Sequence, residues 1–158
     1  MRLYLLYLLT AVTTSWIVLF LLGVSAGFAN HFPVLALLGS VVMFTIAAPI
    51  VVYNMRLGLI LGLISYLLIL PYILLFTKGV LDDGFLHAVT ALAILPLLLV
   101  LFGIYYNVML LRTKIVESPS ILTNRIVKLL LSSVPVGLFL LYLILYGQYW
   151  SWENFKVA

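Results

Sequence analysis

The sequence predicts an all-α integral membrane protein: a bundle of five transmembrane helices with its N-terminus inside and its C-terminus outside. Three observations lead to this prediction. The composition is too apolar for a soluble fold, five long apolar runs follow one another with short connectors, and most basic residues fall on one side of these runs. Residues 1–158 are expected to form a single transmembrane domain.

The composition sets the class of protein. Hydrophobic residues make up 66% of the chain and charged residues only 8%, and the mean hydropathy is +1.34. A soluble domain is about half apolar and about a quarter charged, so this chain has too little polar surface for a water-soluble fold. The sequence contains no cysteine, which excludes disulfides, thiolate metal sites and thiol nucleophiles.

Five apolar runs are long enough to cross a bilayer, which takes about 20 residues. We expect the spans at about 3–28, 33–54, 57–77, 85–111 and 126–147. A segment within hydrocarbon must satisfy its own backbone hydrogen bonds, so long unbroken runs favour helices. The alternating strands of about ten residues that build a membrane barrel are absent from the sequence.

The distribution of basic residues predicts the orientation. If the N-terminus, the turn at 54–57 and the connector at 112–128 share one side, six of the eight Lys and Arg residues lie there. Because basic loops stay in the cytoplasm, this side is expected to be the inside. The expected cytoplasmic anchors are Arg56, Arg112, Lys114, Arg125 and Lys128. They flank apolar runs, which favours binding to lipid headgroups over nucleic acid, and the predicted location is a bacterial inner membrane.

Four prolines lie inside the second to fifth runs: Pro49, Pro71, Pro96 and Pro135. A proline removes one backbone hydrogen bond, kinks the helix and frees a carbonyl that can line a cavity. Prolines are also ordinary in membrane helices, where neighbouring helices satisfy the freed carbonyl. The sequence leaves both interpretations open.

The polar stretch TKGVLDDGFLH at 77–87 holds the candidates for a metal or cofactor site. Asp83 and His87 are four residues apart and would share a helix face, and His31 is expected at a similar depth. Such residues can bind a metal, and two histidines can bind haem. The alternative is that Asp82 or Asp83 caps the fourth helix. We favour this alternative, with no cofactor and no metal.

The middle of each span lacks the groups that chemistry needs. No Asp, Glu, Lys or Arg lies there, although such residues mark proton relays and hydrolytic centres within membranes. Residues 23–27 read GVSAG and match GxSxG, but they end an apolar run that is expected to be a helix, whereas the motif presents a nucleophilic serine at a strand-to-helix turn. We therefore expect that the chain is not an enzyme.

Small residues spaced four apart predict close packing of helices. Such faces let two backbones approach closely, and the partner is either another helix of the chain or another protein. The pairs are Gly23 with Gly27, Gly58 with Gly62, and Ser133 with Gly137.

Polar residues within the spans predict further contacts. Asn54 and Asn107 are expected to form hydrogen bonds between helices, because an amide at membrane depth needs a partner. Thr10, Thr14 and Ser25 share a stripe on the first span. Serine and threonine hydroxyls in membrane helices commonly bond back to their own helix.

Three functions are compatible with these features. The first is a non-enzymatic accessory or assembly subunit that packs against another membrane protein or a second copy of itself. The second is a small carrier or binding subunit for an apolar ligand, such as a quinone, a lipid or a vitamin. The third is a haem or metal protein that uses His31 and His87. In length and number of spans the chain is similar to bacterial cell-shape factors and to the substrate-binding subunits of vitamin importers.

Overall fold

The computed structural model describes residues 1–24, 31–82, 87–113 and 124–147, with side chains for 1–19, 36–82, 94–113 and 124–147. Its elements are five α-helices: α1 (Arg2–Val24), α2 (His31–Tyr53), α3 (Met55–Asp82), α4 (His87–Arg112) and α5 (Arg125–Tyr146). All five are long and apolar enough to cross a membrane. The prediction of an all-helical protein with five such helices is confirmed.

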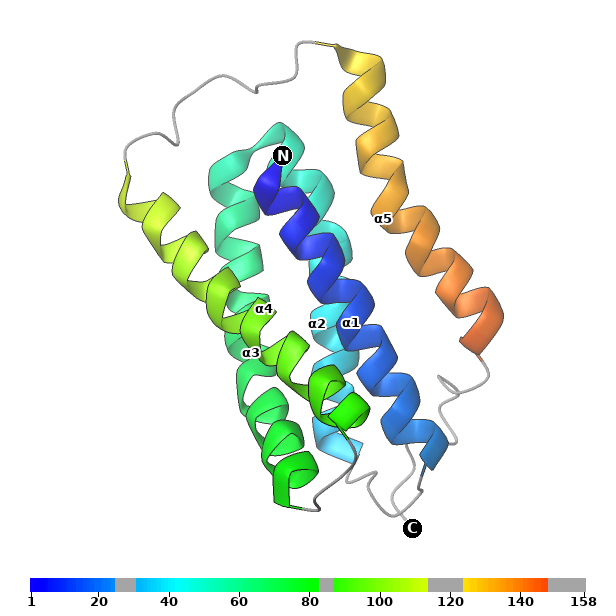
Figure 1. Ribbon diagram of the computed structural model, residues 1–158. Helices are drawn as coiled ribbons and strands as arrows, with labels where there is room; N and C mark the ends of the chain where they lie inside the picture. The colour runs from blue at the N-terminus through cyan, green and yellow to red at the C-terminus, as the bar shows by residue number, and fades with distance from the viewer. Residues whose placement is uncertain (25–30, 83–86, 114–123, 148–158) are drawn as a thin grey trace.

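Four of the helices close into a ring, and the fifth lies outside it. α1 and α3 each pack against both α2 and α4, whereas α5 packs mainly against α2. Figure 1 shows α5 standing apart on one side of the bundle. All side chains of α5 are described, and only that of Pro135 is buried. The fifth helix therefore has one narrow contact face and a wide surface free of other helices.

Successive helices run in opposite directions, which decides where the connectors meet (Figure 1). The start of α1, the junction of α2 with α3, the end of α4 and the start of α5 share one end of the bundle. The basic residues Arg2, Arg56, Arg112 and Arg125 belong to these segments. One end of the bundle is thus basic, as the count along the sequence implied.

The junction of α2 and α3 is a single residue, Asn54. Its side-chain oxygen accepts a hydrogen bond from the backbone N–H of Leu57 at 3.1 Å, and its side chain is exposed. Asn54 therefore caps α3, and the prediction that it bonds to another helix was wrong. The reason is its place at a helix start, where unpaired N–H groups are the nearest donors.

Two other helix ends carry residues that can cap a helix, Asp82 and Asn124. α3 continues to Asp82, beyond the expected end at residue 77, so Asp82 cannot cap α4. Asp83 lies outside the described residues. At the start of α5, Asn124 accepts a hydrogen bond from the N–H of Ile126 at 3.0 Å and so caps this helix.

Candidate functional site

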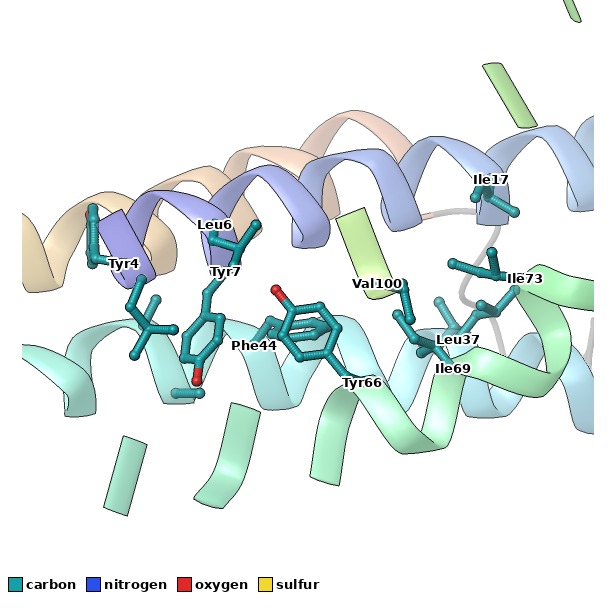
Figure 2. Close-up of a cluster of buried hydrophobic side chains, with 14 of the residues drawn as sticks. Tyr4, Leu6, Tyr7, Ile17, Leu37, Phe44, Tyr66, Ile69, Ile73 and Val100 are labelled. Carbon is teal, nitrogen blue, oxygen red and sulfur yellow. The ribbon is translucent and has the colours of Figure 1, made fainter. Parts of the chain in front are cut away.

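Two tyrosine rings pack into two glycines at the centre of the helix ring. Tyr7 of α1 lies against Gly62 of α3, and Tyr66 of α3 lies against Gly103 of α4. Phe44 of α2 packs edge-on against Tyr66, with the ring centroids 4.7 Å apart. Figure 2 shows Tyr7, Phe44 and Tyr66 converging between the helices. Because a Cβ at either glycine would clash with the tyrosine side chain packed against it, these contacts need glycine.

The hydroxyl of Tyr7 joins three helices. It lies 2.5 Å from Oδ1 of Asn107 on α4 and 3.2 Å from the carbonyl oxygen of Gly58 on α3. The amide nitrogen of Asn107 donates to the carbonyl of Gly103 at 2.7 Å. Asn107 is fully buried, and both ends of its amide are satisfied. Unlike Asn54, Asn107 does bond between helices.

A second hydroxyl pair lies beside the first. Thr10 of α1 donates to the carbonyl of Leu6 at 2.8 Å, so its oxygen accepts from the Tyr66 hydroxyl, 3.0 Å away. One turn further along α1, the buried hydroxyl of Thr14 has no hydrogen-bond partner among the described residues. We call Tyr7, Thr10, Tyr66 and Asn107 the tyrosine cluster.

The tyrosine cluster is suited to holding helices together. Its hydroxyl and amide groups are engaged with one another or with backbone carbonyls. It joins α1 to α3 and α4 across the centre of the ring. Catalysis needs a nucleophile or base that is free to meet a substrate, and the cluster presents no such group. We therefore interpret the cluster as structural.

An apolar groove of about 210 Å³ lies between α5 and the ring, where α1, α2 and α5 meet. α1 lines it with a stripe from Leu8 to Leu19 that includes Ala11, Ser15 and Trp16. By the helical periodicity of about 3.6 residues, this stripe occupies a face of α1 next to the one that carries the tyrosine cluster. The lining from α2 is Val41, Phe44, Thr45 and Ala48, and that from α5 includes Pro135, Leu138, Phe139, Tyr142, Leu145 and Tyr146. We call this cavity the α5 groove.

A hydrogen bond joins α1 to α5 just beyond one end of the α5 groove. Pro135 has no N–H, so it cannot bond to the carbonyl of Leu131, four residues earlier. The Tyr4 hydroxyl donates to that carbonyl at 2.7 Å. Tyr4 and Leu131 each lie one turn before the residues that begin the groove on their helices, Leu8 and Pro135. The carbonyl that Pro135 leaves without a helical donor is thereby satisfied by α1.

The small-residue pairs lie in very different surroundings. Gly58 contacts α2, where a Cβ on Gly58 would lie 2.7 Å from the backbone nitrogen of Val51, and Gly62 contacts Tyr7. Helices of the same chain therefore cover this face of α3. By contrast, Ser133 and Gly137 on α5 are exposed, and no described atom lies within 4 Å of a Cβ on Gly137.

For the remaining predicted residues, the structure describes either the backbone alone or neither backbone nor side chain. His31 and His87 begin α2 and α4 at the same end of the bundle (Figure 1), but their side chains are not described. Gly27 and Lys114 lie outside the described residues, as do the surroundings of Gly23. Among the described residues, no group of three or more His, Asp or Glu side chains is placed to hold a metal ion.

One of the basic residues predicted to be cytoplasmic anchors contacts an aromatic ring. The Nζ of Lys128 on α5 lies 5.9 Å from the ring centroid of Tyr53 on α2, within the range of a cation–π interaction. Arg56, Arg112 and Arg125 are exposed at the same end of the bundle. A basic, solvated end is typical of helix ends at a headgroup layer.

Sequence reasoning missed Tyr7, Tyr66 and Gly103. The signal that could have found Tyr66 is its place in the middle of an apolar run, far from either end. A hydroxyl at that depth needs a hydrogen-bond partner, and no partner is available from water.

Comparisons with protein-family models, with curated proteins and with solved structures found no match. The class of protein is therefore defined by the fold alone. It is a bundle of five helices, each long and apolar enough to cross a membrane.

Proposed function

We propose that this protein is a non-enzymatic membrane protein that binds one apolar ligand, such as a quinone, a lipid or a vitamin, in the α5 groove. The observation that carries the proposal is the groove itself, an apolar cavity of about 210 Å³ between α5 and the helix ring. Grooves between helices are common ligand sites. From the sequence, an accessory subunit was the first expectation, partly because Gly58 and Gly62 offer a small-residue face to a partner. In the structure α2 covers Gly58 and α1 covers Gly62, so this face no longer supports that expectation.

Filling the groove should remove the ligand. Ala11 is half-buried and lines the groove from α1, so Ala11→Phe places a ring in the cavity. Native mass spectrometry of the protein in mild detergent should show one bound small mass in the wild type and none in Ala11→Phe. Gly137→Leu is the matched control because Gly137 is on α5 but outside the groove. A wild-type protein without bound mass would contradict the proposal.

The second candidate is the accessory or assembly subunit. Its support is the exposed pair Ser133 and Gly137 on α5, a helix with little packing inside the chain. Small residues at this spacing favour close helix association in membranes. For this candidate function, Gly137→Leu is the disruptive variant and Ala11→Phe is the control. If a larger protein or a second copy travels with the wild type and is lost only in Gly137→Leu, the subunit function is favoured.

We also propose that the N-terminus is in the cytoplasm of a bacterium and that the chain lies in its inner membrane. The support is the basic end of the bundle, which holds Arg2, Arg56, Arg112 and Arg125 (Figure 1), together with the positive-inside rule. On this proposal the C-terminus is outside.

Single cysteines at the two ends of α3 should establish the orientation. The chain has no cysteine of its own, and Asn54 and Gly79 are both exposed. A membrane-impermeant maleimide should label Gly79→Cys in intact cells and label Asn54→Cys only after permeabilisation. The reverse pattern would mean that the basic end faces outward.

A further inference from the structure

We infer that the α5 groove holds a single hydrocarbon chain of a membrane lipid, with the headgroup at the C-terminal ends of α1 and α5. This inference rests on the proposed function and narrows it. It specifies which part of the ligand is bound and in which direction. Three features carry it: the chemistry of the lining, the length of the groove and the difference between its ends.

Three hydroxyl groups of the lining are already directed to backbone carbonyls. Ser15 donates to the carbonyl of Ala11, and Thr45 donates to that of Val41, both at 2.8 Å. The Tyr142 hydroxyl is directed to the carbonyl of Ser15, 3.5 Å away. The described lining contains no charged side chain. In this lining a quinone ring could be paired only by the indole N–H of Trp16 and the hydroxyl of Tyr146. A carbonyl left without a donor costs about 1–3 kcal/mol, whereas a hydrocarbon chain has no such cost.

The length of the groove matches one leaflet. Its lining runs from Leu8 to Leu19 on α1 and from Pro135 to Tyr146 on α5. Each stretch contains eleven helical rises of about 1.5 Å, or about 16 Å. This is about half the hydrocarbon thickness of a bilayer, which is about 30 Å. A chain from one leaflet therefore fits along the groove.

The two ends of the groove are different. Beyond Leu8 and Pro135, the hydrogen bond from Tyr4 to the Leu131 carbonyl joins α1 to α5 at that end. The opposite end carries Tyr146, half-buried at the last turn of α5. Tyrosine is favoured at the headgroup level of membranes. The chain terminus should therefore lie near Pro135 and the headgroup near Tyr146.

Photo-crosslinking with two phosphatidylcholines tests the direction. One lipid carries a diazirine near the end of an acyl chain, and the other carries it near the acyl carbonyl. Both are incorporated as a minor fraction into phosphatidylcholine vesicles that contain the full-length protein. Peptide mapping should find the chain-end probe around Leu8 and Pro135, and the carbonyl-end probe around Leu19 and Leu145. The reverse order, or equal labelling along the groove by both probes, would overturn the inference.

Groove-filling variants separate the bound chain from lipid that merely surrounds the protein. Ala11→Phe and Leu138→Trp fill the groove from opposite walls, and both should lose the ordered labelling while Gly137→Leu keeps it. Labelling that survives in both filled variants would mean surrounding lipid only, and would also overturn the inference. If the labelling has no order but a bound mass is still lost in Ala11→Phe, the inference fails and the proposed function stands.

Discussion

Gly103→Ala is expected to destabilise the protein, and Gly62→Ala should have a similar effect. The Cβ added at Gly103 would clash with the ring of Tyr66. Tyr66 cannot move away easily, because it is fully buried, bonds to Thr10 and packs against Phe44. Overpacking of this kind costs about 1–3 kcal/mol. The measurement is the loss of helical circular dichroism on heating or on titration with a denaturing detergent.

Gly39→Ala is the matched control for this experiment. Gly39 lies inside α2, and no described atom lies within 4 Å of a Cβ built on it. Alanine is favoured over glycine in a helix by about 1 kcal/mol, so this variant should be as stable as the wild type or more so. Adding Tyr66→Leu to Gly103→Ala should recover part of the lost stability, because the two changes act on one contact. Equal losses in Gly39→Ala and Gly103→Ala would contradict the packing described above.

Tyr7→Phe is expected to cost more free energy of unfolding than the double variant Tyr7→Phe with Asn107→Leu. The single change removes the donor for Oδ1 of Asn107, which is fully buried. A buried polar group left without a partner costs about 1–3 kcal/mol, whereas apolar replacement of both partners is nearly neutral. Hydrogen bonds between membrane helices average about 0.6 kcal/mol, so the difference should be near the lower end of this range. Detergent-unfolding titrations of the two variants measure it.

Tyr105→Phe provides the control, since Tyr105 is 65% exposed on α4 and removal of its hydroxyl orphans no described buried group. Its stability should equal that of the wild type. If the double variant at Tyr7 and Asn107 is as unstable as the sum of the two single variants, the two residues do not act as a pair. The assignment of the tyrosine cluster as a structural link would then be wrong.

The two asparagines show how much of a polar contact can be predicted from sequence. Asn54 and Asn107 are the same residue type near the ends of two helices, and the sequence assigned both to bonds between helices. Asn107 makes such a bond, but Asn54 is the junction residue between α2 and α3 and caps α3. An amide bonds to the nearest free donor or acceptor, and only the arrangement of the helices decides which group that is.

The small-residue faces show the same difference between what the sequence predicts and what the helix arrangement decides. Gly58 with Gly62 and Ser133 with Gly137 have equal spacing, yet the first pair is covered within the chain and the second is open. Spacing places residues on one face of a helix, but it does not say what covers that face. The α5 groove was equally out of reach, because it depends on how closely α5 approaches α1 and α2.

The sequence by itself determined the class of protein, the number of helices and most of their limits. These properties follow from the length and hydropathy of continuous segments, since each span must satisfy its own backbone in hydrocarbon. The tertiary structure alone decided that Tyr7 and Tyr66 pack into Gly62 and Gly103, and that α5 leaves a groove beside α1. Such contacts join residues far apart in the chain. Among helices that are apolar on all sides, hydropathy does not mark which faces meet, so shape and hydrogen bonding make that choice.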